Sequence, residues 1–61
     1  ISPREYLVRY RVARAKELLR LTNHSVTEIA HQIGYDDSAY FSRVFREETG
    51  RSPLVFRRQV R

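Results

Sequence analysis

The stretch that decides the fold is residues 25–50, SVTEIAHQIGYDDSAYFSRVFREETG, in which two short helical patterns are separated by a glycine. Ser25 and Glu28 have the spacing of a capping box, which begins a helix by satisfying free backbone N–H groups. Gly34 follows the first pattern, at the position where helices commonly end in a left-handed residue. Asp37 is the best N-cap for the second pattern, and the last glycine of the stretch ends it. The stretch therefore predicts two helices joined by a sharp turn.

The apolar side chains of both patterns recur with helical spacing, so each predicted helix has one inner face. These faces consist of Val26, Ile29, Ala30 and Ile33 in the first helix, and of Phe41, Val44 and Phe45 in the second. Ala30 lies four positions before Gly34, which suits the close approach of two helices before a turn. This arrangement predicts a helix-turn-helix.

Two serine–proline pairs begin further helices outside this stretch, because serine is a good N-cap and proline is well tolerated at the first helical position. Ser2-Pro3 starts a long helix that continues to about Leu21 without glycine or proline. Ser52-Pro53 starts a short helix through Phe56. The predicted fold is all-α and homeodomain-like, with about four helices.

The domain organisation follows from these helices. Residues 1–22 are predicted to form a linker helix, and residues 23–61 the helix-turn-helix unit with its short C-terminal helix. The two serine–proline pairs lie fifty positions apart, and each is followed by an aromatic residue at the same spacing. We therefore expect an earlier copy of the unit to precede this chain, joined to it by the long helix.

The long helix has two apolar strips, which is expected of a helix that contacts two bodies. The broad strip consists of Leu7, Val8, Val12, Ala15, Leu18 and Leu19, and the smaller one of Tyr6, Tyr10 and Leu21. Arg11 projects into the broad strip, where a guanidinium needs acceptors such as helix-end carbonyls or a carboxylate. Arg11 is therefore predicted to be structural.

Composition and charge narrow the classes of function. The chain has 61 residues, no cysteine and a net charge of +5, which suits a small domain that binds a polyanion. No apolar run is long enough for a membrane span. The charge is uneven, because residues 25–50 carry two basic and five acidic side chains, whereas residues 1–24 carry six basic and two acidic ones and residues 51–61 four arginines. The flanks of the helix-turn-helix thus supply the positive field.

The sequence does not predict an enzyme, a metal site or a cofactor. The two histidines, His24 and His31, do not share a helix face with ligand spacing. The adjacent acids Asp36 and Asp37 are expected to cap a helix. No nucleophile elbow or glycine-rich phosphate loop is present.

The outward face of the third predicted helix carries groups that can bind DNA. Arginine can bridge guanine O6 and N7, and serine can pair with donor or acceptor edges of a base. This face consists of Ala39, Arg43 and Arg46, with Ser42 at its edge and Ser38 at its N-terminal end. The free N–H groups after Ser25 can hold a phosphate, and Arg51, Arg57 and Arg58 can contact backbone phosphates on the flank. The alternative is an ordinary solvated helix face.

Taken together, these residues resemble the DNA-binding region of AraC/XylS-type bacterial transcription regulators. The resemblance covers nearly the whole chain and is carried by Arg11, Val12, Ala15, Leu18, Leu19, Ile29, Ala30, Gly34, Tyr35, Tyr40, Phe41, Ser42, Arg43, Phe45, Gly50, Ser52, Pro53, Phe56 and Arg57. Two departures are mild, since Tyr35 stands where the family often has phenylalanine and Arg46 where lysine is frequent.

The resemblance implies two helix-turn-helix units joined by a long helix, of which this chain resembles the joining helix and the second unit. It implies base contacts by Ser38, Ala39, Ser42 and Arg43. Phosphate contacts are implied for Ser25 and Val26 at the start of the second helix and for Arg46, while Arg51 is a candidate on the flank.

The predicted function is sequence-specific binding of double-stranded DNA within a cytoplasmic bacterial transcription regulator, with the third helix in the major groove. Implied partners are RNA polymerase in the full-length regulator, the first helix-turn-helix unit, and an effector or dimerisation domain in the same chain. Two rival functions are a small helical protein-interaction module with a solvated basic face and, more distantly, a basic membrane binder. The sequence leaves open the operator, the effector, the oligomeric state and the choice between activation and repression. It also leaves open whether this unit binds DNA usefully on its own.

Overall fold

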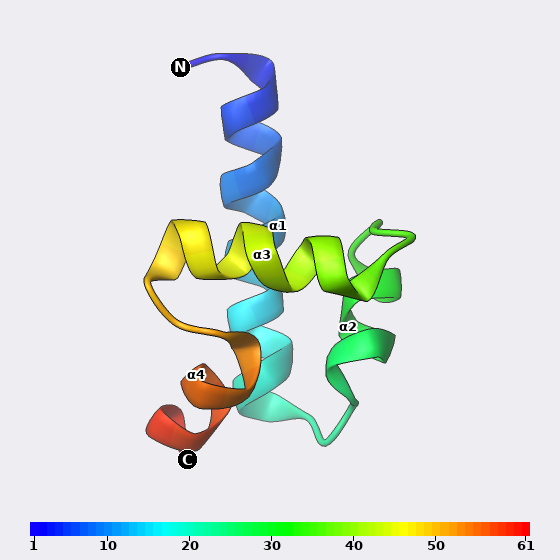
Figure 1. Cartoon of the computed structure of the whole chain (residues 1–61), viewed down its shortest axis with the longest axis vertical. Coiled ribbons are helices and arrows are strands. Elements are labelled where there is room, and N and C mark those ends of the chain that lie inside the picture. The colour runs from blue at the N-terminus through cyan, green and yellow to red at the C-terminus, as the bar shows by residue number, and fades with distance from the viewer.

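The computed structural model describes residues 1–61 and shows four helices without strands (Figure 1). The helices are α1 (Pro3–Leu21), α2 (Val26–Gln32), α3 (Ser38–Thr49) and α4 (Pro53–Val60). α3 crosses in front of α1, and α2 and α4 lie on opposite sides of the C-terminal half of α1. The predicted all-α fold with a long first helix is confirmed.

Each helix begins where the sequence provides a cap. The hydroxyl oxygens of Ser2, Ser25 and Ser52 accept a hydrogen bond from the backbone N–H three residues later, at 3.1 to 3.3 Å. Asp37 caps α3, because its Oδ1 accepts from the Ala39 N–H at 2.9 Å. Such caps stabilise a helix by about 1 kcal/mol each, which is a substantial share of the stability of a small domain.

The core lies where α1, α2 and α3 meet. Its nine buried residues are Val12, Ala15, Leu19, Ile29, Ala30, Tyr35, Phe41, Val44 and Phe45, and Val8, Leu18, Val26, Ile33 and Phe56 pack against them. The predicted inner faces of α2 and α3 are therefore correct. Tyr35, which was not assigned to any face, completes the core from the turn between them.

The turn after α2 requires glycine for two reasons. Gly34 has a φ of 107°, a conformation that side chains rarely adopt. A Cβ atom there would also approach a terminal nitrogen of Arg11 to 2.9 Å. α1 therefore contacts the turn directly at this point.

The environment of Arg11 differs from the prediction. Its guanidinium carbon lies 4.8 Å from the centre of the Tyr35 ring, and no hydrogen bond to a carbonyl or carboxylate is formed. The expectation of an oxygen acceptor was wrong, because the face of an aromatic ring attracts the cation instead and the side chain remains half-buried.

α4 is longer than predicted, since it continues past Phe56 to Val60. Its last turns are held against α1 by Arg57, which donates from Nε to the Leu19 carbonyl at 3.0 Å and from a terminal nitrogen to the Thr22 carbonyl at 3.2 Å. Arg61 also donates to the Thr22 carbonyl. These bonds span segments 35 to 39 positions apart, so local sequence patterns did not indicate them.

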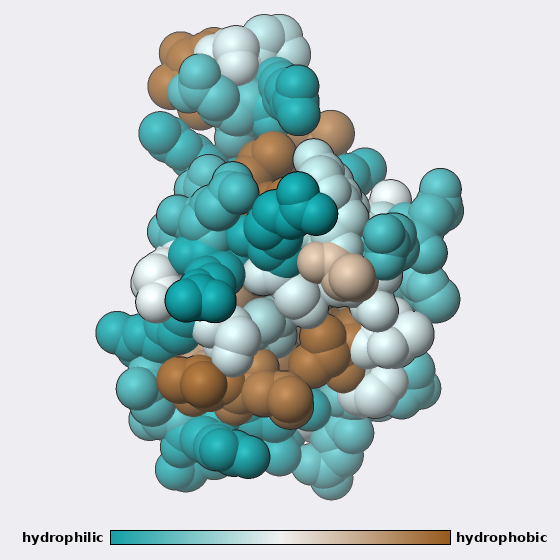
Figure 2. Space-filling view, in the orientation of Figure 1, coloured by the Kyte–Doolittle hydropathy of each residue, from teal (hydrophilic) through white to brown (hydrophobic).

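The N-terminal half of α1 extends past α3 and is exposed. Tyr6 is 64% exposed and Tyr10 61%, and Leu7 is also exposed at 44%, so the broad apolar strip of α1 is not buried along its whole length. Figure 2 shows hydrophobic residues at this end of the molecule and a second group below α3. None of the helices has the length and apolar character needed to cross a membrane.

Candidate nucleic-acid interface

The outward face of α3 lies opposite its buried stripe of Phe41, Val44 and Phe45. Of the predicted contact residues on this helix, Ala39, Arg43 and Arg46 are exposed, while Ser38 and Ser42 are half-buried at the edge. One helix thus presents all five side chains away from the core or at its margin.

Ser38 and α2 come together at one end of this face. The Thr27 hydroxyl donates to the Ser38 Oγ at 3.4 Å, which places the first turn of α2 beside the first turn of α3. Thr27 was not among the predicted contact residues. The sequence could have indicated Thr27, because it lies one helical turn before His31 and both residues are on the side of α2 away from its apolar face.

The start of α2 has two free backbone donors. Ser25 forms both halves of the capping box, since its Oγ accepts from the Glu28 N–H and its own N–H donates to Glu28 Oε1 at 2.9 Å. The Val26 and Thr27 N–H groups have no hydrogen-bond partner. They can bind an anion, with support from the positive end of the helix.

The Glu28 carboxylate is part of this end of α2. The hydrogen bond from the Ser25 backbone, with a second from its side chain, holds the pKa of Glu28 below its ordinary value of 4.5. Glu28 is therefore ionised at neutral pH and serves as a cap, so that the two free N–H groups are left as the donors for a ligand.

Arg46 and Arg51 lie at the other end of α3. Together with Gly50, Ser52 and Val55 they line a surface depression of about 320 Å³. Ser38 and Arg46 are eight positions apart, which corresponds to about 12 Å along a helix axis. The predicted phosphate contacts are therefore divided between two flanks, and the predicted base contacts lie between or beside them.

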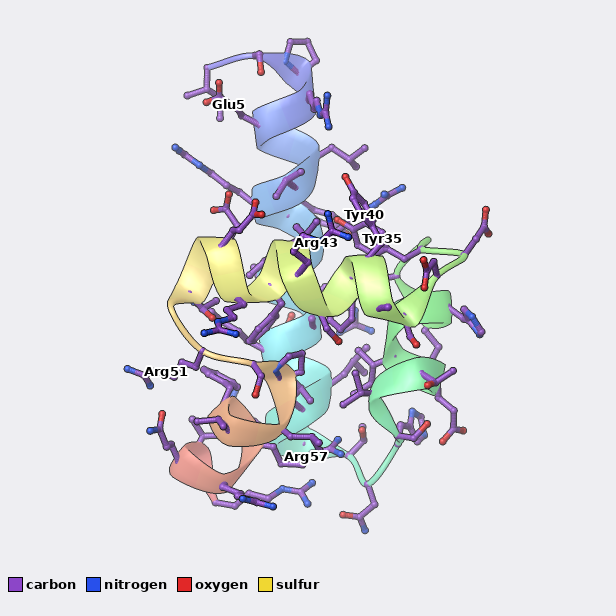
Figure 3. All side chains as sticks on the ribbon, in the orientation of Figure 1. Glu5, Tyr35, Tyr40, Arg43, Arg51 and Arg57 are labelled. Atoms are coloured by element: carbon purple, nitrogen blue, oxygen red, sulfur yellow. The ribbon has the colours of Figure 1, made fainter.

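Arg43 lies over an aromatic ring. Its guanidinium carbon is 5.9 Å from the centre of the Tyr40 ring, three residues earlier on α3. Figure 3 shows Arg43, Tyr40 and Tyr35 on the same side of α3, and Arg51 directed outward near α4. Tyr40 was not among the predicted contact residues, although its spacing of three residues from Arg43 indicates a shared helix face.

The positive charges of this face are unpaired within the protein. The only ion pair of the chain joins Arg14 and Glu17 in α1, at 3.7 Å. Arg43, Arg46 and Arg51 are exposed and form no ion pair. Arg57 is directed elsewhere, because its Nε and one of its terminal nitrogens donate to carbonyls at the end of α1, where burial also lowers the pKa of its guanidinium.

The histidines and acids do not form a metal site, since no group of three or more potential ligands comes together. His24 Nδ1 lies within hydrogen-bond distance of the Gln32 amide, and His31 Nε2 of the Asp36 carbonyl oxygen. Both contacts join neighbouring segments of the helix-turn-helix.

Comparison with known proteins identifies relatives of the whole chain. A family model described as "Helix-turn-helix domain" matches residues 1–59. The HTH-type transcriptional activators RhaS of Salmonella arizonae and Salmonella newport are each 47% identical over 57 residues, which is 93% of this chain and 20% of theirs. The chain thus spans about a fifth of the length of these relatives.

Two solved structures have the same fold. The C-terminal domain of AraT, a response regulator from Geobacillus stearothermophilus, superposes with a TM-score of 0.95 at 41% identity, over 97% of this chain and 49% of that one. The C-terminal domain of the two-component response regulator yesN from Fusobacterium nucleatum has a TM-score of 0.92 at 35% identity, over 93% and 55%. With the family match and these relatives, the chain belongs to the AraC-type family of helix-turn-helix DNA-binding transcription regulators.

Proposed function

We propose that this chain binds DNA sequence-specifically by placing the N-terminal half of α3 in the major groove, as a unit of an AraC-type transcription regulator. The observation that carries the proposal is the outward face of α3, where Arg43 and Arg46 are exposed and form no ion pair. The apolar stripe of α3 lies on the opposite face and is buried in the core. An α-helix fits the major groove of B-DNA, and unpaired arginines suit its anionic surroundings.

Base contacts are assigned to the first two turns of α3. Arg43 is long enough to reach a base edge and can bind guanine O6 and N7 together. Ser38 and Ser42 can bind donor or acceptor edges, and Ala39 can contact a thymine methyl group. Thr27 joins this set through its hydrogen bond with Ser38.

Phosphate contacts are assigned to the two flanks of α3. On one side are Ser25 and Val26 at the start of α2. On the other side are the guanidinium groups of Arg46 and Arg51, which line the surface depression. Ser38, which lies beside the first turn of α2, and Arg46 are separated by about 12 Å along α3, and the major groove is about 12 Å wide with one strand on either side. Such contacts position the helix without reading the sequence.

α1 is assigned the role of a linker over residues 1–22, beside a binding unit over residues 23–61. The support is the exposed apolar end of α1, where Tyr6, Leu7 and Tyr10 lie away from the core. Leu21 is exposed at the opposite end of the helix and does not extend this group. We expect the exposed end to pack against another helix-turn-helix unit of the regulator, and the regulator to act in the cytoplasm with RNA polymerase.

The proposal is tested by fluorescence anisotropy of the chain with double-stranded DNA across a salt series. A protein that neutralises two to four phosphates gives a slope of log K against log salt of about −2 to −4. Selection from a randomised duplex pool should also enrich a common site. A salt-independent signal, or no enrichment over the starting pool, would favour the protein-interaction module instead.

A further inference from the structure

Tyr40 lies between the core of the protein and Arg43. Its ring centre is 5.9 Å from that of Tyr35, with the planes tilted by 57°. The Arg43 guanidinium carbon lies 5.9 Å from the same Tyr40 ring. Tyr40 is 42% exposed as a residue, so it contacts the interior on one side and remains open to the cation on the other.

The rings behind Tyr40 belong to the buried core. Tyr35 is buried, and its ring centre is 5.5 Å from that of Phe41, which is fully buried. Arg11 of α1 lies over the same Tyr35 ring at 4.8 Å. A series of contacts thus leads from α1 and the core, through two tyrosines, to Arg43.

The direction of Arg43 follows from helix geometry. Side chains on a helix lean toward its N-terminus, so Arg43 is directed back over the residue three positions earlier. This brings the guanidinium toward the end of α3 where Ser38 and Ala39 lie. An arginine without such a neighbour samples many rotamers and loses that freedom when it binds.

We propose that Tyr40 is a positioning residue, which holds the Arg43 guanidinium in the orientation used for base contact. Base discrimination then depends on the Tyr40 ring, although the ring itself contacts no base. This inference rests on the proposed role of Arg43 as a base contact. It is independent of the phosphate contacts.

The first test needs no DNA. Ring currents of Tyr40 should shift the side-chain proton resonances of Arg43 upfield in NMR spectra of the free chain. The shift should persist in Tyr40→Phe, which keeps the ring, and disappear in Tyr40→Leu. An unchanged Arg43 signal in Tyr40→Leu, with the fold intact by circular dichroism, would overturn the proposal.

The second test measures discrimination. A duplex selected by the wild-type chain from a randomised pool is compared, by competition anisotropy, with the same duplex altered at each base pair in turn. Tyr40→Leu should reduce the preference at one position by about two- to fivefold, as expected for loss of an exposed cation–π contact. Tyr40→Phe should keep the preference. Tyr10→Leu is the matched control, since Tyr10 is exposed and has no guanidinium over its ring.

Arg43→Ala separates this inference from the proposed function. If Tyr40 acts through Arg43, Tyr40→Leu should cause no further loss of preference in the Arg43→Ala background. An equal loss with and without Arg43 would mean that Tyr40 contacts DNA itself, and the positioning role would be wrong. If Arg43→Ala alone left the preference intact, the base contact proposed for Arg43 would fail, whatever the result for Tyr40.

Discussion

The guanidinium of Arg57 caps the C-terminal end of α1, because its Nε donates to the Leu19 carbonyl at 3.0 Å. The two residues are 38 positions apart in the sequence. The last carbonyls of a helix have no partner within the helix, and a positive charge there is also favoured by the helix dipole. A second bond to the Thr22 carbonyl fixes the orientation of the side chain. Arg57 therefore joins α4 to α1.

Arg57→Ala should lower the free energy of unfolding by about 2 kcal/mol, because two charge-assisted hydrogen bonds are lost. Urea denaturation followed by circular dichroism measures this. Arg58→Ala is the control, since Arg58 is exposed and a surface change of this kind stays within about 0.5 kcal/mol. Equal stability of the two variants would show that the Arg57 bonds contribute nothing. The salt slope of DNA binding should not change in Arg57→Ala.

Gly34→Ala should cost more stability than Gly50→Ala. Both glycines have positive φ, at 107° and 83°, so both substitutions strain the backbone by about 1–3 kcal/mol. Only at Gly34 does a new Cβ meet another side chain, namely Arg11, whereas nothing lies within 4 Å at Gly50. Thermal unfolding of both variants measures the difference. The added cost should diminish in Gly34→Ala/Arg11→Ala, and independence of the two changes would contradict the contact.

Arg11→Ala should lower stability by about 1 kcal/mol, the size of a partly buried cation–π contact. The reason is the loss of its guanidinium from the Tyr35 ring, 4.8 Å away. Arg9→Ala, on the exposed side of α1, should be nearly neutral. The salt slope of DNA binding should stay the same in both. A slope smaller by one phosphate contact, with unchanged stability, would instead make Arg11 a DNA contact.

The Glu28 cap should make stability depend on pH in the acidic range. Because the pKa of Glu28 is lower in the folded state than its ordinary 4.5, its contribution is fully present above 4.5 and is lost as pH falls through the folded value. Urea midpoints measured from pH 6 downward should therefore fall less steeply in Glu28→Gln, which retains a capping amide. Parallel curves for both proteins would show that the ionised cap is unimportant.

Arg43→Ala and Arg46→Ala should affect DNA binding in different ways. Loss of a bidentate contact to guanine costs about 1–3 kcal/mol of discrimination, so Arg43→Ala should weaken binding to the selected site more than to other duplexes. Arg46→Ala should weaken binding to all duplexes and reduce the salt slope by about one. Anisotropy titrations with selected and unrelated duplexes separate the two. A reversed pattern would require a different orientation of α3 in the groove.

The elements of the fold could be predicted because their signals are local. The capping box of Ser25 and Glu28, the cap at Asp37 and the glycine at 34 each act within a few residues, and all were placed correctly. The apolar spacing of α3 also identified its buried side. The opposite side of that helix could then be chosen as the candidate site before any contact was known.

The contacts between distant segments could not be predicted in this way. Nothing near Arg57 indicates that its partners are the carbonyls of Leu19 and Thr22, which are offered by the end of another helix. The partner of Arg11 was predicted to be an oxygen, although the neighbouring turn provides an aromatic ring. Thr27 gained its place beside Ser38 only through the packing of two helices.

α1 is a single helix of 19 residues, and only Val12, Ala15 and Leu19 are buried along it. The exposed N-terminal end of α1 is therefore joined by an uninterrupted helix to the part of α1 that packs against α3. The direction in which that end faces, relative to α3, is set by the number of helical residues between the two parts. Each added residue turns the end by about 100° and moves it by about 1.5 Å. Insertion of one residue after Tyr10 would thus rotate the exposed tyrosines to another side of the molecule. Insertion of seven residues, close to two full turns, would return them to nearly the same side, at a greater distance from α3. The length of α1 therefore determines how a partner bound to its first turns is rotated relative to the outward face of α3.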